Sequence, residues 1–137
     1  MAEKNRKSSS QQSGVSPRLK RDGGLSYLEI PAVDARRSAA FYAYVLGWVV
    51  EGADTDQPKF QDCTGHMIGR WKTGLAISRE PGLMPYIYVD HIEAVIKRIT
   101  ENGGSIVKPP YAEGNLQVAT FRDPSGNLIG VWEEGRD

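Results

Sequence analysis

The residues best suited to chemistry are one carboxylate and several aromatic side chains on predicted strands. Glu29 lies two residues after Tyr27 in the segment LSYLEIPAV, so both side chains share one face of a strand. A carboxylate that faces a partly apolar cavity has a raised pKa, and it can act as a general base or bind a cationic or hydroxylated ligand. Glu29 is therefore the candidate catalytic residue. The alternative is that it forms a salt bridge or lies at a solvated strand edge.

Aromatic side chains on two other predicted strands are candidates for a ligand-binding wall. Tyr86 and Tyr88 share a face of YIYV, and Trp132 lies on the last strand, LIGVWE, in register with Gly130. Aromatic rings with hydroxyl tips suit a small, flat or amphipathic molecule. Gly130 has no side chain, so we expect the cavity to extend there. Glu113, in the loop PPYAEGN, could close over a ligand. The alternatives are ordinary core packing for the rings and a merely polar role for Glu113.

Other catalytic and cofactor motifs are missing from the sequence. His91 opens a predicted helix, and His66 is a lone histidine in a predicted strand, where a hydrogen-bonded scaffold role is the more common one. No Ser, His and Asp spacing identifies a nucleophile, and no glycine-rich phosphate loop occurs. Cys63 is the only cysteine, which excludes an internal disulfide and a thiolate metal cluster. The sequence therefore predicts no cofactor.

The elements that must position these residues occur twice. A strand at LSYLEIPAV precedes a helix that Asp34 caps and Gly47 ends, and three short strand pieces follow up to residue 80. A second strand at residues 86–89 precedes a helix that opens at Asp90 or His91, and the pieces SIVK, LQVATF and LIGVWE follow. The last two are joined by DPSGN, which predicts a tight hairpin.

The two halves superpose at an offset of about 57 residues, which sets His91 against Asp34 and indicates a duplicated module. Each β-α-β-β-β unit has one sheet face covered by its helix and one concave face, so two units are expected to close around a shared cavity. We predict an α+β domain over residues 25–135, with modules at about 25–80 and 84–135.

Residues 1–24 differ in composition from the domain that follows, and we call them the leader. The chain of 137 residues suits one domain, and residues 1–24 hold six Lys or Arg but only two acidic residues. The leader lacks large apolar side chains, so we predict that it is disordered. Its scattered charges and the acidic domain argue against a nucleic-acid partner. No apolar run could span a membrane and no secretory signal is present, so we expect a cytoplasmic protein.

Two segments carry a resemblance to a known family. EIPAVDARRSAAFYAYVLGW resembles the first strand and helix of the vicinal-oxygen-chelate superfamily, which includes glyoxalases, bleomycin-resistance proteins and extradiol dioxygenases, and VATFRDPSGNLIGVWE resembles its final hairpin. The resemblance covers roughly residues 25–134. It implies a glyoxalase-like half-open barrel of two tandem modules around a cavity, a small-molecule ligand, and a homodimer.

Enzymes of that superfamily usually hold a divalent metal through His or Glu on the first strand of each module and Glu on the last. The positions that match here are Tyr27, Met84 and Gly130, and the last predicted strand of the first module, GLAIS, offers no ligand either. Since these side chains cannot supply the expected donors, the resemblance implies a metal-independent member. If Tyr27 occupies a ligand position, Glu29 faces the concave side with it.

Three functions follow from these observations. The first is a metal-independent protein that binds a small organic molecule, either to sequester it or to catalyse proton transfer with Glu29 as the base. The second is a lyase or dioxygenase that holds a divalent metal through displaced ligands such as Glu29, His66 and Glu113. The third is a non-catalytic interaction domain in which the duplicated fold only dimerises.

Overall fold

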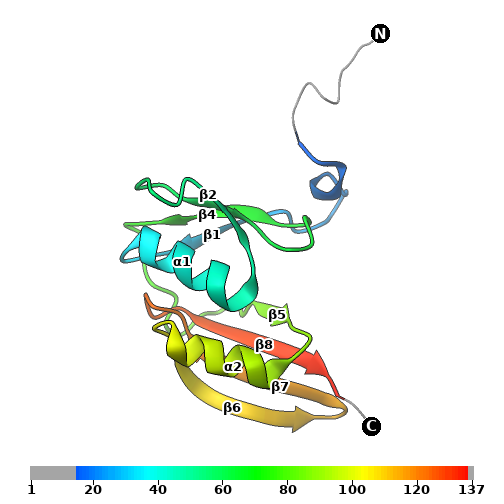
Figure 1. The fold of residues 1–137 in the computed structure, drawn as a ribbon. Coiled ribbons are helices and arrows are strands. Elements are labelled where there is room, and N and C mark those ends of the chain that lie inside the picture. Colours follow the sequence, from blue (N-terminus) through cyan, green and yellow to red (C-terminus); the bar gives the residue numbers. More distant parts are fainter. Residues whose placement is uncertain (1–14, 136–137) are drawn as a thin grey trace.

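The computed structural model describes residues 15–135. After a short 3-10 helix, η2 (Pro17–Leu19), these residues form eight strands and two α-helices in two successive sets (Figure 1). The first set is β1 (Tyr27–Pro31), α1 (Ala35–Leu46), β2 (Val49–Glu51), β3 (Lys59–Gln61) and β4 (Ile68–Lys72). The second set is β5 (Tyr86–Tyr88), α2 (Ile92–Glu101), β6 (Ser105–Glu113), β7 (Leu116–Arg122) and β8 (Leu128–Glu134).

Each set forms its own four-stranded sheet. Sheet A has the order β1-β4-β3-β2 and sheet B has the order β5-β8-β7-β6. In both sheets the first strand of the module pairs in parallel with the last, and the remaining pairs are antiparallel. The sheets do not close into a barrel, and β1 and β5 each form one edge of their sheet, with β2 and β6 at the opposite edges. The predicted α+β class, with two tandem β-α-β-β-β modules and a half-open barrel, is confirmed.

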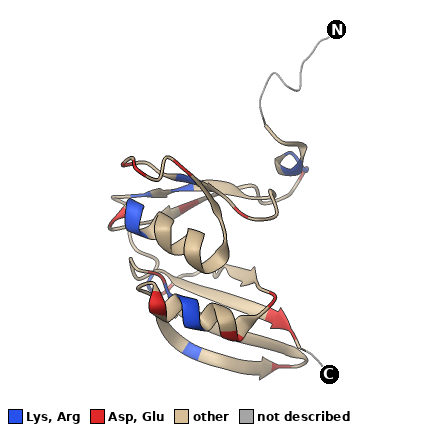
Figure 2. Cartoon of the chain, in the orientation of Figure 1, with Lys and Arg blue, Asp and Glu red and all other residues tan. Residues whose placement is uncertain are grey.

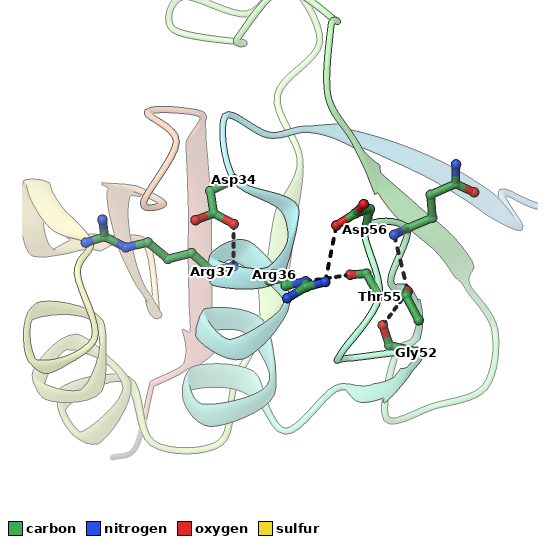
Figure 3. Close-up of polar contacts among 7 residues, drawn as sticks. Asp34, Arg36, Arg37, Gly52, Thr55 and Asp56 are labelled. Carbon is green, nitrogen blue, oxygen red and sulfur yellow. Dashed lines mark hydrogen bonds and ion pairs between the residues drawn. The ribbon is translucent and has the colours of Figure 1, made fainter.

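Helix α1 begins and ends where the sequence predicts. The Asp34 side chain accepts from the Arg37 backbone N–H at 3.2 Å, and Gly47 adopts the left-handed conformation with φ of 75°. The Arg36 guanidinium donates to the Thr55 carbonyl at 3.0 Å and pairs with Asp56, which ties the loop between β2 and β3 to the helix (Figure 3). The Asp34 cap therefore sets the start of α1, and the contacts of Arg36 hold this loop against the helix.

Helix α2 is capped from a distant strand. His91 stands at the N-cap but makes no side-chain capping bond, whereas the buried Glu133 on β8 accepts from the Ile92 backbone N–H at 2.7 Å. A carboxylate at this end of a helix is favourable because the first N–H groups have no partner within the helix. The start of α2 thus depends on the pairing of β5 with β8.

The helices pack beside one another, and each covers one face of its own sheet (Figure 1). Phe41, Tyr42 and Val45 of α1 are fully buried, as are Val95 and Ile99 of α2. An aromatic group continues the core into sheet A through stacked and tilted rings: Tyr42, Trp48, Phe60 and Trp71. Because the helices occupy one face of each sheet, the opposite faces stay open.

The hairpin at DPSGN does more than reverse the chain. Asp123 is buried, and its Oδ1 accepts backbone N–H bonds from Ser125, Gly126 and Asn127, so the predicted tight turn is confirmed. Asn127 Nδ2 also donates to the Pro31 carbonyl of the first module at 2.7 Å. The turn therefore joins the two modules.

Two segments differ from the sequence-based expectation. β6 extends to Glu113, which pairs with Leu116, so the predicted loop around PPYAEGN is wrong for Glu113. Pro109 and Pro110 are tolerated because β6 is an edge strand with register shifts. The predicted strand at GLAIS is also wrong, since β4 is the last strand of the first module along the chain and no strand forms between β4 and β5.

Part of the predicted leader lies against the domain. Residues 1–14 lie outside the described residues. The 3-10 helix η2 places Arg18 so that its Nη1 donates to the Thr64 carbonyl at 2.5 Å.

Candidate functional site

The open face of sheet B carries the predicted aromatic wall. Tyr88 lies opposite Trp132 in the parallel pair of β5 and β8, and the two rings meet edge to face with centroids 4.8 Å apart. Tyr86 and Tyr88 are 50% and 49% exposed. The structure thus brings these three predicted residues together on a surface that a flat molecule can contact.

Gly130 lies next to them but does not leave a gap. It is buried opposite Tyr86, and a Cβ atom built at Gly130 would overlap the Tyr86 ring. The expectation that the cavity extends at Gly130 is therefore wrong. The Tyr86 ring packs over Gly130 and occupies the space that a side chain there would need.

Glu29 on sheet A forms an ion pair with Arg70. Arg70 Nη2 and Nε donate to Glu29 Oε2 at 2.6 and 2.9 Å, and the two residues lie directly opposite one another on β1 and β4. These hydrogen bonds, and the positive charges of Arg70 and Lys72, hold the pKa of Glu29 below its usual value. The predicted raised pKa of Glu29 is therefore wrong, because an oppositely charged partner outweighs desolvation.

The ion pair belongs to a row of charges across sheet A. The strand register places Glu51 opposite Lys59, Lys59 opposite Arg70, and Arg70 opposite Glu29. Figure 2 shows the charged positions on the strands of sheet A, whereas β5 carries none. The open face of sheet A is therefore charged around Glu29, whereas the part of the open face of sheet B that β5 forms is aromatic.

The remaining predicted residues lie apart from the aromatic wall. Tyr27 is 53% exposed on sheet A and pairs with Ile68, while Glu113 is exposed at the end of β6. The seven predicted residues thus fall into an aromatic set on sheet B, two residues on sheet A, and Glu113 at the far end of β6.

A hollow of about 750 Å³ lies where the two modules meet, and we call it the seam cavity. Strands β1 and β5 and both helices contribute to its largely apolar lining, which includes Leu28, Val45, Met67, Tyr86, Tyr88 and Arg98. Of the predicted residues, Tyr86 and Tyr88 line this cavity, whereas Glu29 and Trp132 do not. The volume lies within the range of small-molecule pockets, which is roughly 300–1,000 Å³.

Sequence reasoning missed Arg70 and Arg98. Arg70 follows Gly69 on a short strand, and its partner is set by the pairing of β1 with β4, which the sequence does not show. Arg98 had a local signal, because it stands three residues after the buried Val95 and so borders the apolar stripe of α2. Its Nε donates to the Val45 carbonyl of α1 at 3.2 Å.

At the positions that bind metal in enzymes of the vicinal-oxygen-chelate superfamily, the residues of this chain do not suit a divalent ion. Tyr27 and Met84 carry no carboxylate or imidazole, and a longer side chain at Gly130 is blocked by the Tyr86 ring. Within residues 15–135, no three His, Cys, Asp or Glu side chains are grouped to hold a metal ion, so Glu29, His66 and Glu113 do not form a displaced site. No helix in the same part of the chain is long and apolar enough to cross a bilayer.

Comparison with known proteins decides the family. The sequence profile of the Glyoxalase/Bleomycin resistance protein/Dioxygenase superfamily matches residues 24–131. The chain belongs to this superfamily. A relative from Didymella fabae, described as a "Glyoxylase-like domain-containing protein", is 35% identical over 118 residues, which cover 80% of this chain and 92% of the relative.

A second relative of the superfamily, "Putative glyoxylase CFP32" from Mycobacterium tuberculosis, is 25% identical over 126 residues. That alignment covers 85% of this chain and 48% of the relative, so the chain spans about half the length of this mycobacterial protein.

Solved structures share the fold at low sequence identity. A glyoxalase/bleomycin resistance protein/dioxygenase family enzyme from Burkholderia phytofirmans is 19% identical, with a TM-score of 0.65 and coverage of 82% of this chain and 99% of that chain. TnmS3, an antibiotic binding protein from Streptomyces sp. CB03234, is 18% identical, with a TM-score of 0.62 and coverage of 82% and 97%. One of the proteins that share this fold is therefore described as an antibiotic-binding protein.

Proposed function

We propose that this protein binds a small, flat organic molecule without a metal and holds it rather than transforming it. The observation that carries the proposal is the aromatic wall of Tyr86, Tyr88 and Trp132, two of whose residues also line the seam cavity. Half-exposed rings beside a hollow of drug-sized volume supply the apolar contact area on which such binding depends.

Binding is favoured over proton transfer because of the state of Glu29. A general base works best when its pKa lies near the operating pH, and the Arg70 ion pair moves the pKa of Glu29 in the opposite direction. The carboxylate is also engaged by two donors on one oxygen. The role left for Glu29 is to hold Arg70 on the charged open face.

Metal independence rests on donor chemistry. Oxygen and nitrogen ligands must converge on a divalent ion, and Tyr27, Met84 and Gly130 do not supply such a set. Metal analysis of the purified protein by mass spectrometry is expected to find no stoichiometric divalent ion. A stoichiometric ion would contradict this part of the proposal.

The likeness to an antibiotic-binding protein supports the same ligand type. TnmS3 shares the fold, and its description names binding rather than catalysis. We extend that role to this chain because its own aromatic wall provides a contact surface for a flat molecule.

A cytoplasmic homodimer is part of the proposal. Tyr27, Tyr86 and Tyr88 expose about half of their surface, and such aromatic faces are common where a partner or ligand packs. Light scattering is expected to give twice the chain mass of 15.1 kDa. A monomer at micromolar concentration would contradict the dimer and leave the ligand proposal standing.

Fluorescence titration tests the binding proposal. The two probes are 8-anilinonaphthalene-1-sulfonate, a flat aromatic anion, and N-phenyl-1-naphthylamine, which has a similar body without the sulfonate. At least one probe is expected to bind with one site per chain, and Trp132→Ala should weaken that binding by about tenfold or more.

The matched control is Tyr44→Ala, which removes another exposed ring from α1, outside the wall and the cavity lining. It should leave the probe affinity unchanged, as should Glu29→Gln. If neither probe binds stoichiometrically, or if Tyr44→Ala and Trp132→Ala weaken binding equally, the proposal is wrong.

A further inference from the structure

We infer that the seam cavity receives the body of the ligand and that Arg98 pairs there with an anionic group on it. The inference rests on the proposed function and names the ligand class: a flat, largely apolar molecule that carries one negative charge. It also places the ligand between the two modules rather than on the open face of sheet B alone.

The lining of the cavity accounts for the apolar body. Leu28 of β1, Val45 of α1 and Met67 contribute from the first module, and the edge strand β5 contributes from the second through residues that include Tyr86 and Tyr88. Such a lining offers few hydrogen-bonding partners to a ligand that is polar along its whole length. A ligand that fits it must present apolar surface to both modules.

Arg98 is the reason to expect a negative charge on the ligand. It is the only Lys or Arg in the cavity lining, and it has no ion pair with a carboxylate within residues 15–135. Its Nε donates to the Val45 carbonyl, which anchors the guanidinium where α1 and α2 meet. A guanidinium anchored in this way still has N–H donors on its two terminal nitrogens for a carboxylate or sulfonate.

Asp62, one of the two acidic residues in the lining, does not compete for Arg98. Asp62 Oδ1 already accepts from the Thr64 backbone N–H, the Thr64 hydroxyl and the Gly65 backbone N–H at 3.2, 2.8 and 2.9 Å. Its charge is therefore satisfied within its own turn. An incoming anion is the partner that suits the guanidinium best.

The two probes distinguish charge from apolar contact. The sulfonate probe should bind the wild-type protein more tightly than the neutral probe. Arg98→Gln should lower the affinity for the sulfonate probe by about tenfold and leave the neutral probe unchanged, because only the charged group loses its partner. Arg98→Lys should retain most of the preference. Lys97→Gln, which removes a neighbouring charge outside the lining, is the matched control and should change neither probe.

A second variant tests the location. Ala94 is exposed on α2 and lines the cavity, so Ala94→Phe should fill the cavity without disturbing the core and should weaken both probes. Lys97→Phe adds the same ring to the same helix outside the lining and should weaken neither. Thermal melts of the variants verify that each is folded.

The outcomes separate this inference from the proposed function. Equal loss of both probes in Arg98→Gln, or no loss of either, would overturn the pairing with an anion. Unchanged binding in Ala94→Phe, together with weakened binding in Trp132→Ala, would place the ligand on the open face and overturn the location. Absence of binding by either probe would overturn the proposed function itself.

Discussion

Tyr42 Oη donates to Asp123 Oδ2 at 2.8 Å, and both residues are buried. Tyr42 lies on the helix of the first module and Asp123 in the hairpin of the second. Ser125 strengthens the same junction, since its hydroxyl accepts from the Val33 backbone N–H and lies within hydrogen-bond distance of Ser38. The modules are therefore joined by a buried polar network as well as by apolar packing of the helices.

Removal of the Tyr42 hydroxyl should weaken this junction. Asp123 keeps its backbone donors and Asn127 in Tyr42→Phe, so we expect a loss of about 1–2 kcal/mol in the free energy of unfolding. Urea unfolding measures the loss. Tyr44→Phe removes an exposed hydroxyl from the same helix and should cost much less. An equal effect of both substitutions would contradict the role of the network.

Because of the same hydroxyl, we expect the stability of the folded protein to fall at alkaline pH. Burial, followed by the neighbouring Asp123 carboxylate, raises the pKa of Tyr42 well above its usual value. The folded protein therefore holds this proton more tightly than the unfolded chain, and the associated stability is present below about pH 10 and falls as the pH rises further. Tyr42→Phe should lose less stability than the wild type between pH 9 and 11. Identical losses would show that Tyr42 does not contribute.

Gly130→Ala should displace the Tyr86 ring. The added methyl group overlaps that ring, so we expect destabilisation of about 1–3 kcal/mol. The double variant Gly130→Ala with Tyr86→Ala should recover most of the loss, because the overlap is removed. Thermal melts of the two single variants and the double variant measure this coupling. Additive losses would contradict the packing of the ring over the glycine.

Because of the Glu29 ion pair, we expect stability to be lost at acid pH, in the opposite direction to the alkaline loss expected for Tyr42. Because the pKa of Glu29 is lowered in the folded state, its stabilising effect is present above the ordinary carboxyl pKa and is lost as the pH falls. Glu29→Gln should lower the melting temperature slightly at pH 7 and have no effect near pH 2. The pair is partly exposed, so added salt should reduce the difference at pH 7. An effect that is equal at both pH values would contradict the ion pair.

Pattern and local chemistry predicted the elements well. The Asp34 cap, the Gly47 end of α1 and the turn after Asp123 depend on neighbours within a few residues, and all three are confirmed. The capping of α2 departs from this rule, since Glu133 supplies the acceptor from another strand. Local signals identify a helix, but they do not identify a cap that comes from elsewhere in the chain.

Periodicity and turn chemistry act over short distances, so they predicted the duplicated modules, the order of their elements and the faces on which Tyr86, Tyr88 and Trp132 lie. Three features emerge only when the chain is folded: Arg70 neutralises Glu29, the Tyr86 ring covers Gly130, and Arg98 borders a cavity. Glu29 and Arg70 are 41 residues apart in the chain. Their meeting depends on the register of β1 and β4 within the first module, whereas the cavity beside Arg98 depends on the packing of one module against the other, and no local pattern encodes either.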